Sequence, residues 1–359
     1  MLKFNIGKPM MSRFVFLFAS TLLIPNHLFA GEVKSDGDDL IVKLKGPIEI
    51  KSADGDYSAK IGGRLQWDYN YAELNGDADE DDLNIRRARL YLSGNIKDWS
   101  YKMQFNVGNN NGGTPEDMYI RYNGWGKKAV VTVGKQKEPF GLEALESSKD
   151  ISYLERSSIS EAYAPGRSEG VQVNGQYNKL TYALGVFQDD SAGNGMAVTG
   201  RVTYSLINAN EQVLHLGLAH SNRNDDVSNT GVELAYADGA YHVQTEYVSS
   251  DQNSQSRDGL YVQAGWIITG ETRPYKNGVF KRVKPGSASG AWEVVARYEE
   301  GDGNYADVEL GATDATSYGL GINYYYNDFI RIGGTYTDAK DNLSNDKGSE
   351  FRLRLQLAL

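Results

Sequence analysis

The sequence predicts an all-β protein, a 16-stranded antiparallel transmembrane β-barrel. Three observations predict it: apolar and polar residues alternate with a period of two, tight turns alternate with long polar loops, and no long apolar run occurs after the N-terminus. The 359 residues include 40 Gly, 24 Tyr and no Cys, and the mean hydropathy is −0.50. A helical membrane protein is excluded, because each spanning helix needs roughly 20 mostly apolar residues.

The N-terminus has the pattern of a secretory signal peptide over residues 1–30. Lys3, Lys8 and Arg13 precede an apolar run over residues 14–24, and the small residue Ala30 ends the segment. An apolar run this short does not span a bilayer, and its flanks are those of a cleaved signal. We therefore expect a protein exported from the cytoplasm, with an N-terminal periplasmic segment at 31–57 and the barrel at 58–359.

The alternation is clearest in residues 61–71, 99–107 and 351–359. Successive side chains of a strand point to opposite faces, and a strand of about ten residues crosses a bilayer. We expect these residues to point outward: Trp67, Tyr69, Trp99, Phe105, Leu353 and Leu355. We expect these to point inward: Arg64, Gln66, Lys102, Arg352 and Arg354.

Sixteen candidate strands follow one another along the chain. They begin near residues 58, 82, 98, 116, 128, 169, 179, 196, 211, 229, 240, 257, 290, 314, 328 and 348. Tight turns alternate with longer loops near 73–81, 108–115, 138–168, 189–195, 221–228, 301–313 and 339–347. The connection 271–289 is long where a tight turn is expected. A soluble β-sandwich also alternates, but here Trp and Tyr crowd the apolar face and the other face is too polar for a core.

The predicted inner face is rich in cations. It carries Arg64, Arg87, Arg89, Arg121, Arg201, Arg297, Arg331, Arg352, Arg354, Lys60 and Lys102. The formal net charge of −10 comes largely from loops such as 73–82. Rings of Arg or Lys in a narrow pore favour anions. The alternative is that these arginines only pair with carboxylates of neighbouring strands.

Arg86 breaks the alternation, because strict period two places it with Ala88 and Leu90 on the lipid face. An Arg at the bilayer midplane costs roughly 2–4 kcal/mol. Either Arg86 lies at the rim or a β-bulge turns it inward.

The longest loop, 138–168, has no clean period, and structureless loops of that size are usually functional. Its cations are Lys149, Arg156 and Arg167. Its acids outnumber them: Glu138, Glu143, Glu146, Asp150, Glu155 and Glu161.

An ordered set of motifs runs along the chain. They are residues 46–70, Arg86-Arg-Ala-Arg89, Lys137-Glu-Pro-Phe-Gly-Leu142, Ser147-Ser-Lys149, Leu154-Glu-Arg156, Ala164-Pro-Gly-Arg167, Thr269-Gly-Glu-Thr-Arg-Pro-Tyr275 and Gly278-Val-Phe280. These motifs resemble the phosphate-selective porin O/P family. The resemblance implies a trimeric porin with an inward-folded loop 3, in which basic residues of the wall and of that loop bind the anion. The matching positions are Arg64, Arg86, Arg87, Lys149 and Arg156, to which we add Arg89 and Arg121 as pore-lining residues. The acids of the loop and the final residue, Leu359, depart from the family pattern.

We therefore expect an outer-membrane diffusion porin of a Gram-negative bacterium that passes small hydrophilic solutes, with anions such as phosphate favoured. The partners expected are outer-membrane lipid, lipopolysaccharide and two further copies in a homotrimer. The acidic pI of about 5.1 argues against nucleic acid, and no cofactor or metal site is predicted. The alternatives are a general or cation-preferring porin, a barrel enzyme of the lipase type, and a structural barrel. The enzyme is disfavoured because His215 and His242 lie in alternating strands without a nucleophile motif.

Overall fold

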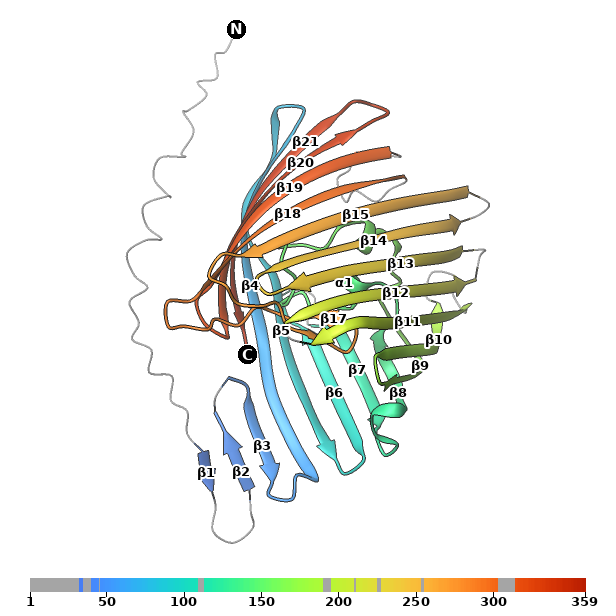
Figure 1. Ribbon diagram of the computed structural model, residues 1–359, viewed down its shortest axis with the longest axis vertical. Coiled ribbons are helices and arrows are strands. Elements are labelled where there is room, and N and C mark those ends of the chain that lie inside the picture. Colours follow the sequence, from blue (N-terminus) through green and yellow to red (C-terminus); the bar gives the residue numbers. More distant parts are fainter. Residues whose placement is uncertain are drawn as a thin grey trace.

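A computed structural model describes residues 32–34, 40–44, 46–108, 113–189, 195–209, 211–224, 227–252, 255–302 and 314–359. Its main sheet has nineteen strands, of which β1–β3 lie outside the ring and sixteen close it (Figure 1). The ring consists of β4 (Tyr57–Leu74), β5 (Asp77–Ile96), β6 (Trp99–Asn106), β7 (Thr114–Tyr122), β8 (Val130–Lys137), β9 (Arg167–Tyr177), β10 (Leu180–Asp189), β11 (Gly195–Ala209), β12 (Gln212–Arg223), β13 (Val227–Asp238), β14 (Tyr241–Gln252), β15 (Gln255–Ile267), β18 (Ala291–Asp302), β19 (Asp314–Tyr325), β20 (Ile330–Asp341) and β21 (Lys347–Ala358).

The last strand closes the ring on the first. β21 pairs antiparallel with β4 from Gly348↔Leu74 to Ala358↔Arg64. Closure gives the backbone N–H and C=O groups of every strand in the ring a neighbouring strand to bond. Hydrocarbon could not hydrogen-bond these groups if they were left free at a sheet edge. The predicted 16-stranded antiparallel barrel is confirmed.

The two faces of the strands divide as the alternation predicts. On β4, Gln66 is 0% exposed and Trp67 is 46% exposed; on β21, Arg354 is 1% and Leu353 44% exposed. A register slip of one residue would exchange these faces. Outward apolar and inward polar residues fit a barrel whose outside meets lipid and whose inside is wet or ion-paired.

The hairpin between β4 and β5 differs from the prediction of a loop at 73–81. Asn75 and Gly76 form a two-residue turn with φ of 55° and 89°, and the acidic residues after them already belong to β5. Asn-Gly accepts positive φ at both turn positions, which matches the twist of the flanking strands. The run of carboxylates looks like a loop from its charge, but the turn residues determine the structure.

The N-terminal strands β1 (Glu32–Lys34), β2 (Leu40–Lys43) and β3 (Ile48–Ser52) extend the sheet beyond the ring. β3 pairs with the beginning of β4, from Ile48↔Ile61 to Lys51↔Ser58, so β4 pairs with β3 first and with β21 further along. This hairpin lies at the end of the barrel that carries the short turns (Figure 1). The signal peptide predicted at 1–30 lies outside the described residues.

The long connection between β15 and β18 starts at the same end. Tyr241, at the tight β13–β14 turn, pairs with Trp266 near the end of β15. The connection contains the short hairpin of β16 (Tyr275–Lys276) and β17 (Val279–Phe280). Val279 and Phe280 are buried with Leu142 and Val213, so the connection packs against α1 (Leu142–Leu145) as well as against the wall.

The segment between β8 and β9 contains α1 and α2 (Ser158–Tyr163), and η2 (Gly126–Lys128) lies in the turn before β8. Among the described residues, no helix has both the length and the apolar composition needed to cross a membrane.

Candidate functional site

Residues 138–166 lie against the inner side chains of the barrel wall. Arg331 Nη1 donates to the Ile151 carbonyl at 2.6 Å, and Asn323 Nδ2 donates to the Ser152 carbonyl at 2.7 Å. Arg354 donates to the Leu154 carbonyl. A segment without regular structure leaves its carbonyl groups unpaired unless such donors meet them. The inward cations of β20 and β21 are therefore also the anchors of this segment.

Glycines of the wall admit the side chains of the segment. A Cβ atom at Gly319 would overlap the Tyr153 hydroxyl, and one at Gly259 would overlap Ile159. Tyr153 and Ile159 are buried. Part of the high glycine content is thus explained by the close approach of this segment rather than by turns.

One carboxylate of the segment contacts four arginines from two strands, β5 and β21. Glu155 accepts from Arg87 at 2.9 and 2.8 Å and from Arg86 at 3.2 Å through each oxygen. Arg352 and Arg354 of β21 ion-pair with the same carboxylate. Although burial raises the pKa of Glu155, the charges of Arg354, Arg87 and Arg86 prevail and hold it well below its usual range. We call these four arginines and Glu155 the Glu155 cluster.

A β-bulge brings Arg86 into this cluster. Gln66 pairs with Arg87, but the next residue of β4, Trp67, pairs with Ile85, so Arg86 is left opposite no residue of β4. A bulge inserts one residue and redirects its side chain. Of the two alternatives for Arg86, the bulge is the correct one.

A second group of cations surrounds a cavity of about 240 Å³. Lys60 and Arg64 come from β4, Lys102 from β6 and Lys149 from the inner segment. Arg64 Nη1 donates to Ser148 Oγ at 2.5 Å, and Lys102 pairs with Asp117 at 2.5 Å. Among the described residues, no carboxylate side chain ion-pairs with the other three cations. Burial lowers the pKa of Lys149, although Asp150 opposes this shift.

We call this group the lysine pocket; its lining is Lys60, Gly63, Arg64, Tyr91, Ser93, Lys102, Gln104, Ser147, Lys149 and Leu359. Leu359 is bonded beside it, since Leu359 N donates to the Gly63 carbonyl and Tyr91 Oη donates to the main-chain oxygen of Leu359. Of the predicted site residues, the structure therefore brings Arg64 and Lys149 together.

The remaining predicted site residues are engaged elsewhere. Arg89 pairs with Glu116 of β7. Arg121 donates to Thr132 Oγ1 at 3.1 Å and lies over the Tyr119 ring. Arg156 donates to the carbonyls of Glu143 and Glu146, at 3.1 and 2.9 Å, so it holds the inner segment in shape.

Three acids of the inner segment pair with arginines that lie outside it. Glu138 pairs with Arg223 at 3.0 Å, Glu143 with Arg297 at 2.6 Å and Glu146 with Arg273 at 2.7 Å. Arg273 belongs to the β15–β18 connection, whose role the sequence analysis leaves open. The high count of acids in a loop that faces an arginine-rich wall is the signal from which this pairing could have been inferred.

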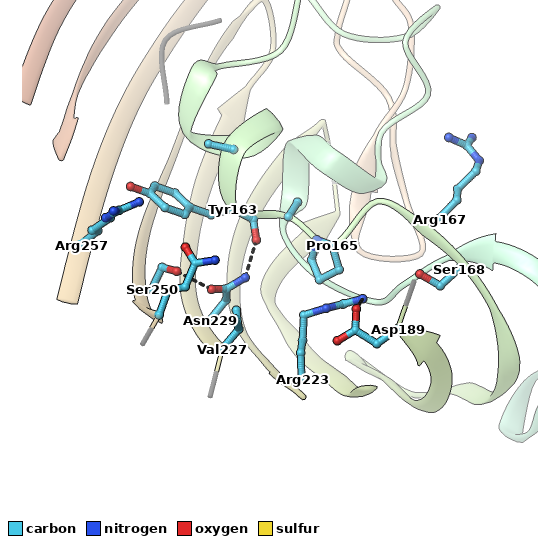
Figure 2. A pocket seen from close by; sticks show the side chains of 13 residues that line it. Tyr163, Pro165, Arg167, Ser168, Asp189, Arg223, Val227, Asn229, Ser250 and Arg257 are labelled. Atoms are coloured by element: carbon cyan, nitrogen blue, oxygen red, sulfur yellow. Dashed lines mark hydrogen bonds and ion pairs between the residues drawn. The ribbon is translucent and has the colours of Figure 1, made fainter. Parts of the chain in front are cut away.

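A larger cavity of about 530 Å³ lies between α2 and the ends of β10 and β12–β15 (Figure 2). Asn229 Nδ2 donates to the Tyr163 carbonyl at 2.8 Å and Ser250 Oγ donates to Asn229 Oδ1 at 2.7 Å, which fixes α2 to the wall. Arg167, Arg223 and Arg257 surround the cavity, with Asp189 beside Arg223. This cavity lies at the long-loop end, opposite the N-terminal hairpin.

The two buried histidines are wall residues that hydrogen-bond to carboxylates. His242 Nε2 and Ser152 Oγ both bond Oε1 of Glu293, at 2.8 and 2.7 Å. A hydrolytic triad needs the histidine between the serine and the acid, whereas here the acid lies between the other two. His215 bonds Glu233 and the Tyr275 hydroxyl.

The family model described as "Phosphate-selective porin O and P" matches residues 59–229 and 219–359. Porin O of Pseudomonas aeruginosa is 30% identical over an alignment of 427 positions, which covers 94% of this chain and 97% of that protein.

The chain belongs to the phosphate-selective porin O and P family.

Solved porin structures share its fold. The anion-selective porin from Comamonas acidovorans superposes with a TM-score of 0.58 at 12% identity, covering 84% of this chain and all of that one. The outer membrane channel DcaP of Acinetobacter baumannii superposes with a TM-score of 0.56 at 14% identity, covering 86% and 99% of the two chains. At these identities the likeness concerns the fold alone.

This member of the porin O and P family is an outer-membrane porin of a Gram-negative bacterium. The expected family, barrel, location and porin function are confirmed. Its family and fold are those of channels.

Proposed function

We propose that this porin conducts small anions, with phosphate and other oxyanions preferred. The observation that carries the proposal is the lysine pocket, where Lys60, Arg64 and Lys149 face a cavity without a carboxylate side chain paired to them in the described structure. Low-dielectric walls focus the field of such cations. Arg64 also offers a planar guanidinium, which suits the oxygens of phosphate.

The alternative of a cation-preferring porin is based on the acids of the inner segment. Five of its six acids, Glu138, Glu143, Glu146, Glu155 and Glu161, each pair with at least one arginine, and the sixth, Asp150, has no ion pair among the described residues. An ion-paired carboxylate contributes little field at a distance. The three cations of the lysine pocket, Lys60, Arg64 and Lys149, outnumber Asp150, so we infer a net positive charge where a solute meets them.

We further propose that residues 138–166 form the narrow section of the pore. Donors from β18–β21 and side chains from β4 hold the segment across the lumen. A sixteen-stranded barrel otherwise leaves a wide aqueous channel, so a segment fixed in this way sets the size limit for solutes.

The assembly and surroundings proposed are those of the family. The apolar outer face of β21 and its neighbours would meet lipid or a second copy in a homotrimer, and the acidic residues of the β4–β5 hairpin would meet lipopolysaccharide through divalent ions. We propose that the N-terminal strands β1–β3 lie on the periplasmic side, because the short turns of outer-membrane barrels lie there.

The deciding experiment is the reversal potential of the purified porin in a planar bilayer under a potassium chloride gradient. We expect the reversal potential to have the sign of a pore that prefers chloride to potassium. We also expect added phosphate to block the chloride current. A potential that shows potassium preference would overturn the anion proposal and leave the porin fold and family unaffected.

A further inference from the structure

The Glu155 carboxylate is surrounded by more donors than it can satisfy. Oε1 is approached by Arg86 Nε, Arg87 Nη1, Arg352 Nη1 and Arg354 Nη2, and Oε2 by Nη2 of Arg86 and of Arg87. A carboxylate has about four acceptor positions. The site therefore holds more N–H donors than the two oxygens of Glu155 can accept from. An oxyanion with more oxygens could accept hydrogen bonds from more of them.

The charges around this carboxylate do not cancel. Asp68 and Glu350 are the other acids paired with these four arginines, so the cluster keeps a formal charge of one positive with Glu155 ionised. Asp68 is 0% exposed, whereas the side chains of Arg86 and Glu155 are 42% and 21% exposed. The exposed part of the cluster is therefore the side that Arg86 and Glu155 form.

The backbone at Glu155 is held independently of its side chain. Arg297 Nη1 donates to the Glu155 carbonyl at 3.0 Å, and Arg354 donates to the neighbouring Leu154 carbonyl. The carboxylate can therefore leave the arginines by side-chain rotation while the segment stays in place.

We propose that Glu155 is an internal counter-anion, which occupies a four-arginine oxyanion site and competes with the tetrahedral oxyanion that permeates. The proposal rests on the proposed anion function and adds its regulation. The carboxylate shields the arginines between passages, so an incoming phosphate exchanges with it and is released again rather than trapped. Tight binding alone would slow permeation, because a conducting site must also let its ion leave.

The test is the substitution Glu155→Gln, with inorganic phosphate as the probe. We expect the phosphate concentration that half-blocks the chloride current to fall at least fivefold, about 1 kcal/mol at 1.4 kcal/mol per factor of ten. The matched control is Glu161→Gln, which removes one charge from the same segment at an exposed position paired with Arg156. Equal shifts in both variants, or no shift in Glu155→Gln, would overturn the proposal.

Two further measurements separate competition from loosening of the segment. Uptake of neutral sugars of graded size into liposomes should keep the wild-type size limit in Glu155→Gln; a larger limit without tighter phosphate block would mean that Glu155 is only a tether, and would overturn the proposal. Adding Arg86→Gln to Glu155→Gln should cancel most of the gain in phosphate block, because Arg86 is the exposed arginine of the cluster.

The outcomes also distinguish this inference from the proposed function. If the wild-type porin prefers potassium but Glu155→Gln gains phosphate block, the anion preference is wrong and the role of Glu155 stands. If the wild type prefers chloride and Glu155→Gln is unchanged, the anion preference stands and the role of Glu155 is refuted.

Discussion

Arg354 of the last barrel strand and Asp68 of the first form a two-pronged ion pair across the closing seam, with Nε–Oδ1 at 2.7 Å and Nη2–Oδ2 at 2.5 Å. Both side chains are 0% exposed. A buried ion pair contributes uncertain net stability, but losing one partner leaves a charge in a low-dielectric site. The seam thus depends on electrostatics as well as on its backbone ladder.

Replacing Arg354 by Met should therefore destabilise the barrel by about 3–5 kcal/mol, because Asp68 stays buried with only the longer contact to Arg352, at 3.4 Å. Urea unfolding in lipid vesicles, followed by tryptophan fluorescence, measures the change. The double variant Arg354→Met with Asp68→Asn should recover part of the loss, since no unpaired charge remains. Equal losses in the single and double variants would show that the pair matters only through packing.

Charge reversal in the lysine pocket should change selectivity. Lys149→Glu places a carboxylate beside Arg64 and should lower the chloride-to-potassium permeability ratio about tenfold, corresponding to about 1–2 kcal/mol at a wet site. The reversal potential in a salt gradient reports the ratio. Lys127→Glu, which makes the same charge change at an exposed residue of η2, should leave it close to the wild-type value; a similar shift there would point to net charge rather than to the pocket.

Removing residues 142–163 and joining the ends with a short Gly/Ser linker should raise single-channel conductance about twofold or more, since a sixteen-stranded barrel without an inner segment is wide. Shortening the 342–346 turn, which lies outside the lumen contacts, serves as the control. Unchanged conductance after removal of 142–163 would contradict the proposed narrow section.

The pH dependence of the Glu155 cluster follows from the lowered pKa of Glu155. Its unfolded-state pKa is about 4.3, and arginine charges hold the folded value well below this. Because the pKa of Glu155 is lower in the folded protein, its ion pairs contribute their full free energy at every pH above the unfolded-state pKa. This contribution is lost only as the pH falls through the folded-state pKa. Single-channel current should accordingly show no new substates between pH 7 and pH 4. New substates that begin at pH 5 to 6 would mean that Glu155 is not held by the four arginines.

The sequence was sufficient to predict the strands, because each one repeats the same period-two signal. All sixteen strands exist, and the inward and outward positions of Gln66, Trp67, Leu353 and Arg354 are as predicted. The β4–β5 connection was predicted wrongly, because the acidic residues there suggest a loop while Asn75-Gly76 forms a tight turn.

The site could be predicted only in part. Arg64 and Lys149 share a cavity as expected, and Arg86 is turned inward by a bulge, one of the two alternatives stated. Which carboxylate pairs with which arginine was not predictable, because Glu155 and Arg354 are 199 positions apart and meet only through the path of the inner segment. Alternation determines the face of a residue, but it carries no information on contacts across the lumen.

The composition of the Glu155 cluster has a consequence for the order in which the protein matures. Its arginines come from the second and the last strand of the ring, and its carboxylate comes from the middle of the chain. An open sheet in the periplasm or at the insertion machinery, in which the last strand is not yet paired with the first, therefore has the separate charges but not the assembled cluster. Anion binding by the Glu155 cluster would arise in a single step, when the last strand pairs with the first. A partly inserted chain would therefore lack this anion site.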